Sequence, residues 1–303
     1  MAAISVHGLR KRYGAVHAVD ELSFEVAEGE LCALLGPNGA GKTTTVEILE
    51  GHRTADAGQV RVLGFDPAAG QRDFRERIGI VLQEAGFDEE QTVRELVEMH
   101  AGLYPRQADP AQLIALVGLG EKTDARVKTL SGGQRRRLDL ALGLAGDPDV
   151  LFLDEPTTGF DPAARRQAWE LVERLRGLGK TILLTTHYLD EAQHLADRVI
   201  VIAGGRLVWQ GPPERLIDHA GGRSVIRFLL PDGTDPADLP AVGETSVVGA
   251  QVEVTAPDPV TALHRLTTWA LERDVALAGL ALERRSLEEA YLDLLAQVGG
   301  DDA

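Results

Sequence analysis

The sequence predicts an α/β domain with a mainly parallel sheet, a helical insert within that domain, and a small α+β domain after it. Residues 1 to about 220 alternate short apolar runs with amphipathic segments, which is typical of helices packed on a parallel sheet. Strand-like runs disappear between Thr92 and Gly146, so we expect a helical subdomain at about 92–146. Strand and helix patterns resume afterwards, and 221–303 is expected to form a small accessory domain.

The strands expected in the first domain are apolar runs bounded by glycine, proline or charged turns. They are Ile4 to Leu9, Leu22 to Val26, Leu31 to Leu35, Gln59 to Leu63, Ile78 to Leu82, Val150 to Leu153, Thr181 to Thr185, Val199 to Ile202 and Arg206 to Trp209. The run at 31–35 is apolar throughout and predicts a buried strand. Its single cysteine, Cys32, is therefore expected to fill the core rather than to react.

The helical insert is predicted from periodicity and from helix-start signals. Thr92 to Leu103 carries apolar residues at helical spacing, and Pro105 follows its end. Asp109-Pro110 has the residue types of a helix cap followed by a first helical position. A third helix is expected from Gln134 to Ala145, and the basic cluster Arg135-Arg136-Arg137 on it is interpreted as a solvated face.

The C-terminal segment predicts the order strand, strand, helix, strand, helix. The expected strands are Val225 to Leu230, Val247 to Val254 and Val275 to Leu282. The first helix is expected from Asp258 to Arg273, and the residues expected to face its core are Val260, Leu263, Ala270 and Leu271. No catalytic pattern occurs in this segment.

Composition excludes several classes of protein. The formal net charge is −16, and the last 83 residues contain 6 basic and 14 acidic side chains, a balance of −8. This acidity opposes a broad nucleic-acid-binding surface. No apolar run approaches the roughly 18 residues needed to cross a bilayer, and the N-terminus lacks the features of a secretory signal. We therefore expect a cytoplasmic chain without bound nucleic acid.

A glycine-rich loop after the strand at 31–35 predicts a phosphate site. Its glycines turn backbone N–H groups inward, and the helix that follows presents its positive end to the phosphates. Lys42 is expected to reach the β- and γ-phosphates of a nucleotide, and the Thr43 hydroxyl to coordinate Mg²⁺. The residues expected to cradle the phosphates are Gly36, Pro37, Asn38, Gly39, Ala40, Gly41, Lys42, Thr43 and Thr44.

Polar side chains at three other strand ends complete the predicted chemistry. Asp154 and Glu155 end an apolar strand, and two adjacent carboxylates in that place are costly unless a metal or a reacting group uses them. Asp154 is expected to hold Mg²⁺, and Glu155 to polarise the water that attacks the γ-phosphate. Gln83 is expected to serve the metal or the water, and His187 to hydrogen-bond the γ-phosphate and orient that water.

A second anion-binding turn lies within the insert, in the string Leu130-Ser131-Gly132-Gly133-Gln134. Ser131, Gly132 and Gly133 open a helix and offer a hydroxyl, exposed N–H groups and a helix N-terminus. One small chain hardly needs two such sites for one phosphate unless the two face each other across a dimer.

The motifs, taken in order, resemble a complete ATP-binding cassette of the ABC transporter family. The resemblance covers residues 1 to about 220 and implies a P-loop NTPase fold that binds ATP and Mg²⁺. It implies that Tyr13 stacks on adenine and that Asp161 crosses a dimer interface. It further implies that residues 131–134, Gln134 included, complete the ATP site of the opposite cassette. Phe160 is bulkier than the aliphatic residue expected before Asp161. Because the opposite cassette completes each ATP site, a lone copy is expected to bind ATP but to hydrolyse it poorly.

The resemblance also implies partners and a place of action. The strings at 186–192 and 286–292 are similar to those of ATPase subunits from bacterial drug-resistance-type exporters. A homodimer on a separate membrane permease, at the cytoplasmic face of the cell membrane, is therefore expected to hydrolyse ATP to drive efflux. A soluble non-transport switch and an importer subunit remain alternatives, and the sequence does not name the cargo.

Overall fold

The chain divides into two compact units, Met1–Pro213 and Glu214–Ala303. The structure is a computed structural model that describes residues 1–81, 86, 88–219, 224–231, 234–256, 258–283 and 286–300. Gln83 lies outside the described residues, so its expected role stays a prediction.

A six-stranded sheet forms the centre of the first unit, in the order β5-β6-β7-β3-β8-β9. All neighbouring pairs are parallel except β8 and β9, as expected for strands joined by helical crossovers. The strands are β3 (Leu31–Leu35), β5 (Ile78–Val81), β6 (Val150–Asp154), β7 (Thr181–Thr185), β8 (Arg198–Ala203) and β9 (Arg206–Gly211).

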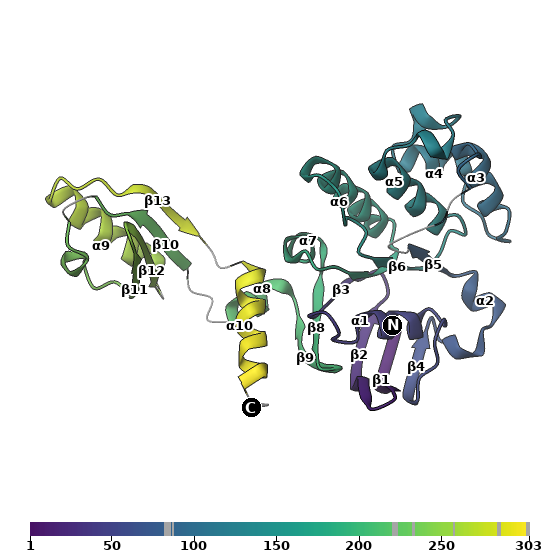
Figure 1. Ribbon diagram of the computed structural model, residues 1–303, viewed down its shortest axis with the longest axis horizontal. Coiled ribbons are helices and arrows are strands. Elements are labelled where there is room, and N and C mark those ends of the chain that lie inside the picture. The colour runs from purple at the N-terminus through teal and green to yellow at the C-terminus, as the bar shows by residue number, and fades with distance from the viewer. Residues whose placement is uncertain are drawn as a thin grey trace. The chain divides into compact units, whose positions relative to one another are not determined.

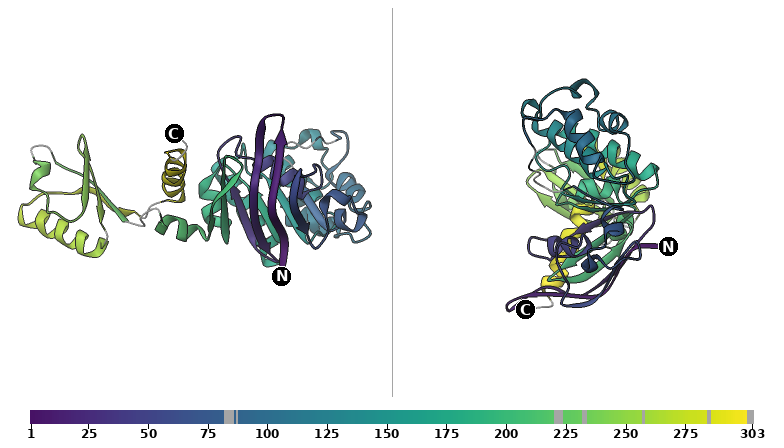
Figure 2. Two further views of the ribbon diagram at one scale, coloured as in Figure 1. Left: turned by 90° about the horizontal axis from the view of Figure 1, so that it is seen from below. Right: turned by 90° about the vertical axis from the view of Figure 1, so that its right-hand side faces the viewer.

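A smaller antiparallel sheet of order β2-β1-β4 covers one face of the central sheet. Its strands are β1 (Ala2–Tyr13), β2 (Val16–Ala27) and β4 (Ala57–Val62), and the long β1–β2 hairpin is plain in Figure 2. Alternate residues of the central strands point into two cores. Cys32 and Phe152 pack toward the small sheet and α1 (Lys42–Leu49), whereas Leu31 and Leu153 pack toward the helices on the other face. Cys32 is fully buried, which confirms its expected place in the core.

The helical insert carries α3 (Val93–Ala101), α4 (Pro110–Leu116) and α5 (Gly132–Gly143), which lie together at one end of the unit (Figure 1). Thr92 and Glu95 form a reciprocal capping box at the start of α3, and Asp109 caps α4 ahead of Pro110. These two helix starts confirm the expectations from the sequence. The remaining helices of the unit are α2 (Arg72–Arg75), α6 (Pro162–Gly177) and α7 (Leu189–Leu195).

The second unit contains an antiparallel sheet of order β11-β12-β10-β13. Its elements are α8 (Pro213–His219, from the unit boundary), β10 (Ser224–Leu229), β11 (Glu244–Val248), β12 (Gln251–Ala256), α9 (Pro259–Glu272), β13 (Ala278–Glu283) and α10 (Leu287–Gly300). The single strand expected at 247–254 is wrong. Gly249, at φ 62°, turns the chain there, so that Val247 pairs with Val252 in a hairpin.

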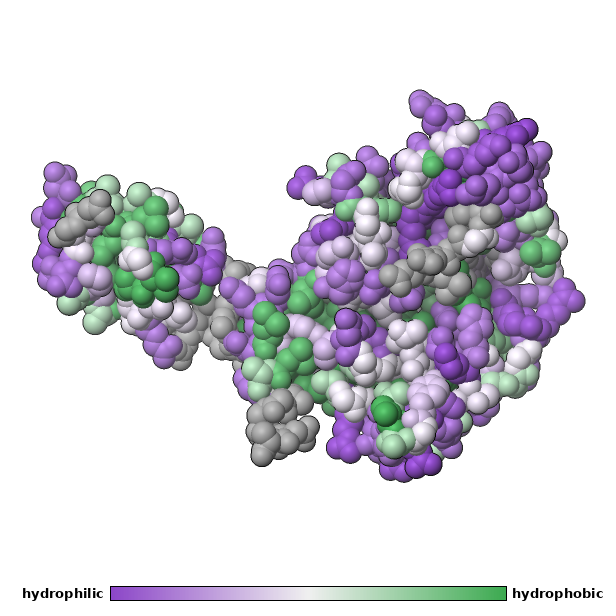
Figure 3. All heavy atoms as spheres, viewed as in Figure 1, coloured by the Kyte–Doolittle hydropathy of each residue, from purple (hydrophilic) through white to green (hydrophobic). Residues whose placement is uncertain are grey.

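The expectation for the buried face of α9 is half right, because Leu263 and Ala270 pack against the core while Val260 and Leu271 do not. Ala262, Leu266, Trp269 and Ala270 pack on the sheet, whereas Val260 and Leu271 are 75% and 82% exposed. Apolar residues occur on both faces of this helix, and spacing alone did not decide which face meets the sheet. Figure 3 shows apolar residues gathered on one face of the second unit.

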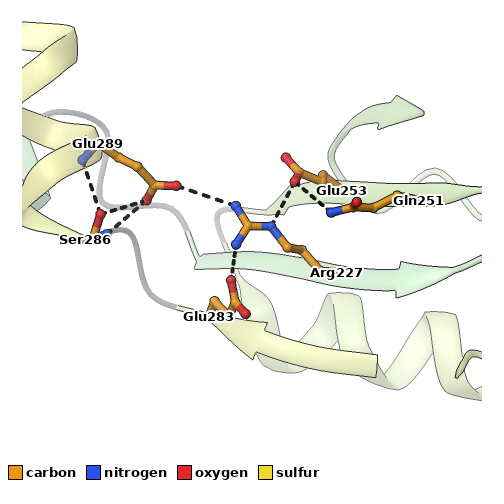
Figure 4. A network of polar contacts seen from close by, with 6 residues as sticks. All are labelled: Arg227, Gln251, Glu253, Glu283, Ser286 and Glu289. Atoms are coloured by element: carbon orange, nitrogen blue, oxygen red, sulfur yellow. Dashed lines mark hydrogen bonds and ion pairs between the residues drawn. The ribbon is translucent and has the colours of Figure 1, made fainter. Parts of the chain in front are cut away.

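Arg227 joins three strands of this unit to the start of α10 (Figure 4). Its Nε donates to Glu253 at 2.8 Å, one terminal nitrogen pairs with Glu283, and the other lies 3.5 Å from Glu289. Glu289 also accepts the Ser286 backbone N–H at 2.9 Å in a capping box. The string at 286–292 thus begins with a helix cap that Arg227 ties to the sheet.

Candidate functional site

Three adjacent parallel strands bring the predicted site residues to one edge of the central sheet. The phosphate loop follows β3, Asp154 ends β6 and Glu155 follows it. His187 comes after β7, which lies between β3 and β6. Because carboxyl ends of parallel strands share an edge, residues far apart in the sequence meet there.

Glycine is required at both ends of the phosphate loop. Gly41 precedes α1 with φ 99°, and a Cβ on it would lie 2.2 Å from the carbonyl oxygen of Ala18. A Cβ on Gly36 would lie 2.3 Å from the carbonyl oxygen of Ile202. The backbone therefore packs too closely for any side chain at these positions, which fixes the loop against β2 and β8.

Lys42 lies over the phosphate loop. Its Nζ donates to the carbonyl oxygens of Gly36 at 2.7 Å and Pro37 at 3.1 Å. Burial lowers the pKa of Lys42, while the charges of Glu155 and Asp154 oppose that shift. The amine thus lies within electrostatic reach of both carboxylates at the edge of the sheet. The remaining loop residues, Asn38, Gly39, Ala40, Thr43 and Thr44, lie in the turn and the first turn of α1.

Asp154 is oriented by the neighbouring strand. It pairs in register with Thr185, whose hydroxyl donates to its carboxylate. A hydroxyl from Thr43 and a carboxylate from Asp154 are hard oxygen ligands of the kind that Mg²⁺ binds. The donor set therefore fits Mg²⁺.

Glu155 lies beside His187. Glu155 Oε1 is 3.3 Å from His187 Nδ1, and Glu155 Oε2 accepts the Thr158 hydroxyl at 3.0 Å. The Glu155 backbone has φ 47°, in the left-handed region, and its N–H donates to the Thr185 carbonyl oxygen at 3.0 Å. A non-glycine residue in that region is strained, and such strain is concentrated at functional sites.

The Ser131 turn opens α5 at the surface. Ser131 caps the helix, accepting the Gln134 N–H at 3.3 Å, while Gln134 Oε1 accepts the Ser131 N–H at 2.9 Å. A Cβ on Gly132 or Gly133 would meet no atom within 4 Å. The packing of this chain therefore gives no reason for glycine at either position. The cap also gives Gln134 a structural role that was not predicted from the sequence.

Asp161 and Tyr13 have neighbours within their own chain. Asp161 caps α6, accepting backbone N–H groups from Ala163 at 2.9 Å and Ala164 at 2.8 Å. Tyr13 ends β1 with 42% of its surface exposed, and the charged groups of Arg53 and Lys11 lie 5.6 and 5.7 Å from its ring centre. Their expected roles at an interface and at adenine stay predictions.

Arg136 does not lie on the solvated face that the sequence predicted for it. Its side chain is 12% exposed, so it does not belong to a solvated face, and it reaches the turn after β6. The sequence feature that indicates a buried Arg136 is Asp139, a charged residue within the apolar run of α5. A buried carboxylate needs a partner, and an arginine three residues earlier on the helix supplies one.

Comparison with known proteins identifies the family. Residues 19–158 match the model of the ABC transporter family. The daunorubicin resistance ATP-binding protein DrrA3 of Streptomyces coeruleorubidus is 40% identical over 99% of this chain and 96% of its own length. This chain belongs to the ABC transporter family. The family resemblance noted in the sequence is confirmed, and the chain is an ATP-binding subunit of that family.

Other ABC proteins resemble this ATP-binding subunit over most of its length. The Nod factor export ATP-binding protein I of Mesorhizobium japonicum is 40% identical over 96% of this chain and 86% of its own length. The solved structure of cbiO1 from Clostridium perfringens, part of the ABC transporter complex cbiONQ, has 28% identity and a TM-score of 0.64 over 72% of this chain and 91% of its own. These matches and the observed sheets confirm the predicted fold class.

The C-terminal unit of this ABC subunit also has relatives. Residues 224–286 match the model of the ABC transporter domain-containing protein-like C-terminal domain. Within the described residues of either unit, no helix has the length and apolar character needed to span a bilayer.

Proposed function

We propose that this chain is the ATP-hydrolysing subunit of an exporter and works as a pair around two ATP molecules. The open surface at Gly132 and Gly133 carries the proposal. Glycine costs helix stability relative to alanine, and here the chain's own packing needs neither residue. Close approach by a group from outside the chain explains both. The helix N-terminus and the Ser131 hydroxyl suit that group to be the γ-phosphate of ATP on a second copy.

The chemistry follows from the edge of the central sheet. The phosphate loop binds the β- and γ-phosphates, and Lys42 neutralises part of their charge. Glu155 takes a proton from the attacking water as general base, and His187, 3.3 Å from that carboxylate, holds the water and the γ-phosphate in line. Tyr13 stacks on adenine, and Asp161 contacts the second copy.

Thr43, Asp154 and Gln83 would hold Mg²⁺. The metal would screen the phosphate charge that otherwise repels an attacking water. Thr185, through its hydroxyl, orients the Asp154 carboxylate for that task.

A cavity between the central sheet and the helical insert supports a membrane partner. It has a volume of about 440 Å³ and lies among the end of α1, α2, β5, α3 and α5. Its lining includes Glu50, His52, Phe74, His100 and Tyr104. We propose that a cytoplasmic helix of the permease docks here. The chain would then act at the cytoplasmic face of the membrane without spanning it.

The names of the relatives favour export over the alternatives. One relative is named for daunorubicin resistance and another for Nod factor export. Import requires the same ATP chemistry, and a soluble switch would need no permease. Affinity capture from native membranes separates a transport subunit from a soluble switch, because a transport subunit brings down an integral membrane protein whereas a soluble switch acting in translation brings down ribosomes. ATP-dependent cargo movement in vesicles that contain the captured protein then separates export from import.

The Glu155→Gln variant tests the hydrolytic assignment. Glutamine keeps the shape of the side chain but cannot accept the proton, so turnover should fall by about 100-fold or more while ATP binding persists. ATP should also trap the variant as a dimer, measured by size-exclusion chromatography with ATP and Mg²⁺. Hydrolysis at the wild-type rate would refute the assignment of Glu155 as base.

A further inference from the structure

The Arg136 guanidinium crosses from α5 of the helical insert to the turn that carries Glu155. One terminal nitrogen donates to the carbonyl oxygens of Asp154 at 2.8 Å and Glu155 at 3.2 Å. Its Nε donates to the carbonyl oxygen of Pro156 at 3.1 Å. Three consecutive carbonyl groups of the turn thus accept from one side chain, which requires the planar fork of an arginine.

Asp139 holds this guanidinium in place. Its carboxylate accepts from the remaining terminal nitrogen of Arg136 at 2.8 Å, and the two side chains are only 10% and 12% exposed. A buried arginine with every nitrogen engaged has little freedom to swing. A shift of α5 would therefore move the turn as well, because the Arg136 side chain joins the two with little freedom to rearrange.

The turn needs external support because its backbone is strained. Glu155 has φ 47°, in the left-handed region, where the Cβ of a non-glycine residue crowds the following carbonyl oxygen. The Glu155 N–H is held by the Thr185 carbonyl oxygen, and its own carbonyl oxygen by Arg136. Hydrogen bonds on both sides of the residue thus fix the direction in which its carboxylate points.

We propose that Arg136 is a positioning residue, which sets the carboxylate of Glu155 for hydrolysis by clamping its turn to the helix that begins at Ser131. The inference rests on the proposed function of Glu155. It links the helix that completes a neighbour's ATP site to the general base of the chain's own site.

Steady-state ATP hydrolysis by Arg136→Met tests the proposal. Methionine keeps an apolar stem but donates no hydrogen bond, so kcat should fall by about 10- to 100-fold, as expected for a displaced catalytic group. The KM for ATP should stay within twofold, since the hydrogen bonds of Arg136 described above go to Asp139 and to the turn after β6. Arg136→Lys, which keeps charge but not the fork, should recover part of kcat. The matched control is Arg174→Met on the exposed face of α6, which should leave both constants unchanged.

A second measurement separates positioning from general support of the fold. Arg136→Met is combined with Glu155→Gln, and ATP-driven dimerisation is measured by size-exclusion chromatography. If Arg136 acts through Glu155, the double variant dimerises as the single Glu155→Gln variant does. Loss of that dimer, or a kcat for Arg136→Met within twofold of wild type, would overturn the proposal. If Glu155→Gln itself hydrolyses ATP normally, the proposed function fails instead, so the two failures are distinguishable.

Discussion

Among the described residues of the first unit, three carboxyl groups are buried, and each is accommodated differently. Asp139 faces Arg136, yet burial raises its pKa to about 6. Glu191 is fully buried, which raises its pKa, and its Oε1 accepts the Trp169 indole N–H at 3.0 Å. Glu50 is 5% exposed, and burial, with the charges of Asp154 and Glu47, raises its pKa to about 8. Glu50 is therefore protonated in the folded chain at neutral pH.

The Glu50→Gln variant tests this protonation. Because the pKa of Glu50 is about 8 in the folded chain and near its ordinary value of 4.5 in the unfolded chain, the folded state binds an extra proton between these two pH values. The resulting stability is complete below about pH 4.5 and is lost as pH rises to about 8, a change on the order of a few kcal/mol. Glutamine cannot ionise, so the difference in melting temperature between the variant and wild type should shift in favour of the variant as pH rises from 5.5 to 8.5. An equal difference at both pH values would contradict the burial of a neutral Glu50.

The sequence predicted residues whose chemistry is local and missed those whose role depends on tertiary contacts. Gly41 and Lys42 are specified by a loop pattern, and the structure shows why only glycine fits. Arg136 looked like one of three surface arginines because nothing along the chain shows that the turn after β6 lies opposite. Val260 and Leu271 were assigned to a core because hydrophobicity does not tell which face of α9 meets a sheet.

At the scale of elements, Arg227 is the tie between the second sheet and α10. It contacts Glu253 of β12, Glu283 of β13 and Glu289 of α10, while it lies itself on β10. The four side chains are 31–48% exposed, so each pair contributes at most about 1 kcal/mol. The tie therefore orients the first turn of α10 more than it stabilises the unit.

Arg227→Met should loosen the start of α10. Backbone amides of residues 286–292 should exchange hydrogen faster, because the Glu289 side chain loses its cationic partner, while the melting temperature falls only slightly. Hydrogen exchange read by mass spectrometry measures the effect. Arg265→Met, on the exposed side of α9, serves as the control. Equal exchange rates in both variants would show that the contact between Arg227 and Glu289 does not stabilise the start of α10.

The strands of the first unit followed from the sequence, because apolar runs are local signals. The ranges of α2, α6 and α7 were not predicted, and neither was the separate antiparallel sheet of β1, β2 and β4, because pairing between strands is not a local signal. The turn at Gly249 was missed because the apolar alternation continues across it, and the glycine alone did not indicate a hairpin. The position of the edge strands β11 and β13 in the second sheet depends on pairing, which no local pattern encodes.

At the scale of the whole molecule, the sequence predicted a site divided between two copies, and Ser131→Arg tests that division. An arginine at the start of α5 removes the cap hydroxyl and places a bulky cation where the second copy is expected. ATP binding by the monomer, measured by equilibrium dialysis, should stay nearly unchanged, since the phosphate loop is untouched. Dimerisation and turnover should be lost. Weakened binding by the monomer would mean that Ser131 serves its own chain.

The glycines at 132 and 133, which the packing of their own chain does not require, determine which ATP site a defective copy would affect. In the proposed pair of copies, the general base at one ATP would come from one chain and the glycine turn at 132–133 from the other. A chain defective only in its glycine turn would therefore impair hydrolysis of the ATP bound by its neighbour. A chain defective only in its general base would impair hydrolysis of the ATP that it binds itself. When one copy has the defective turn and its partner has the defective base, both defects would affect the same ATP site. The other ATP site would keep its own base and glycine turn unmutated.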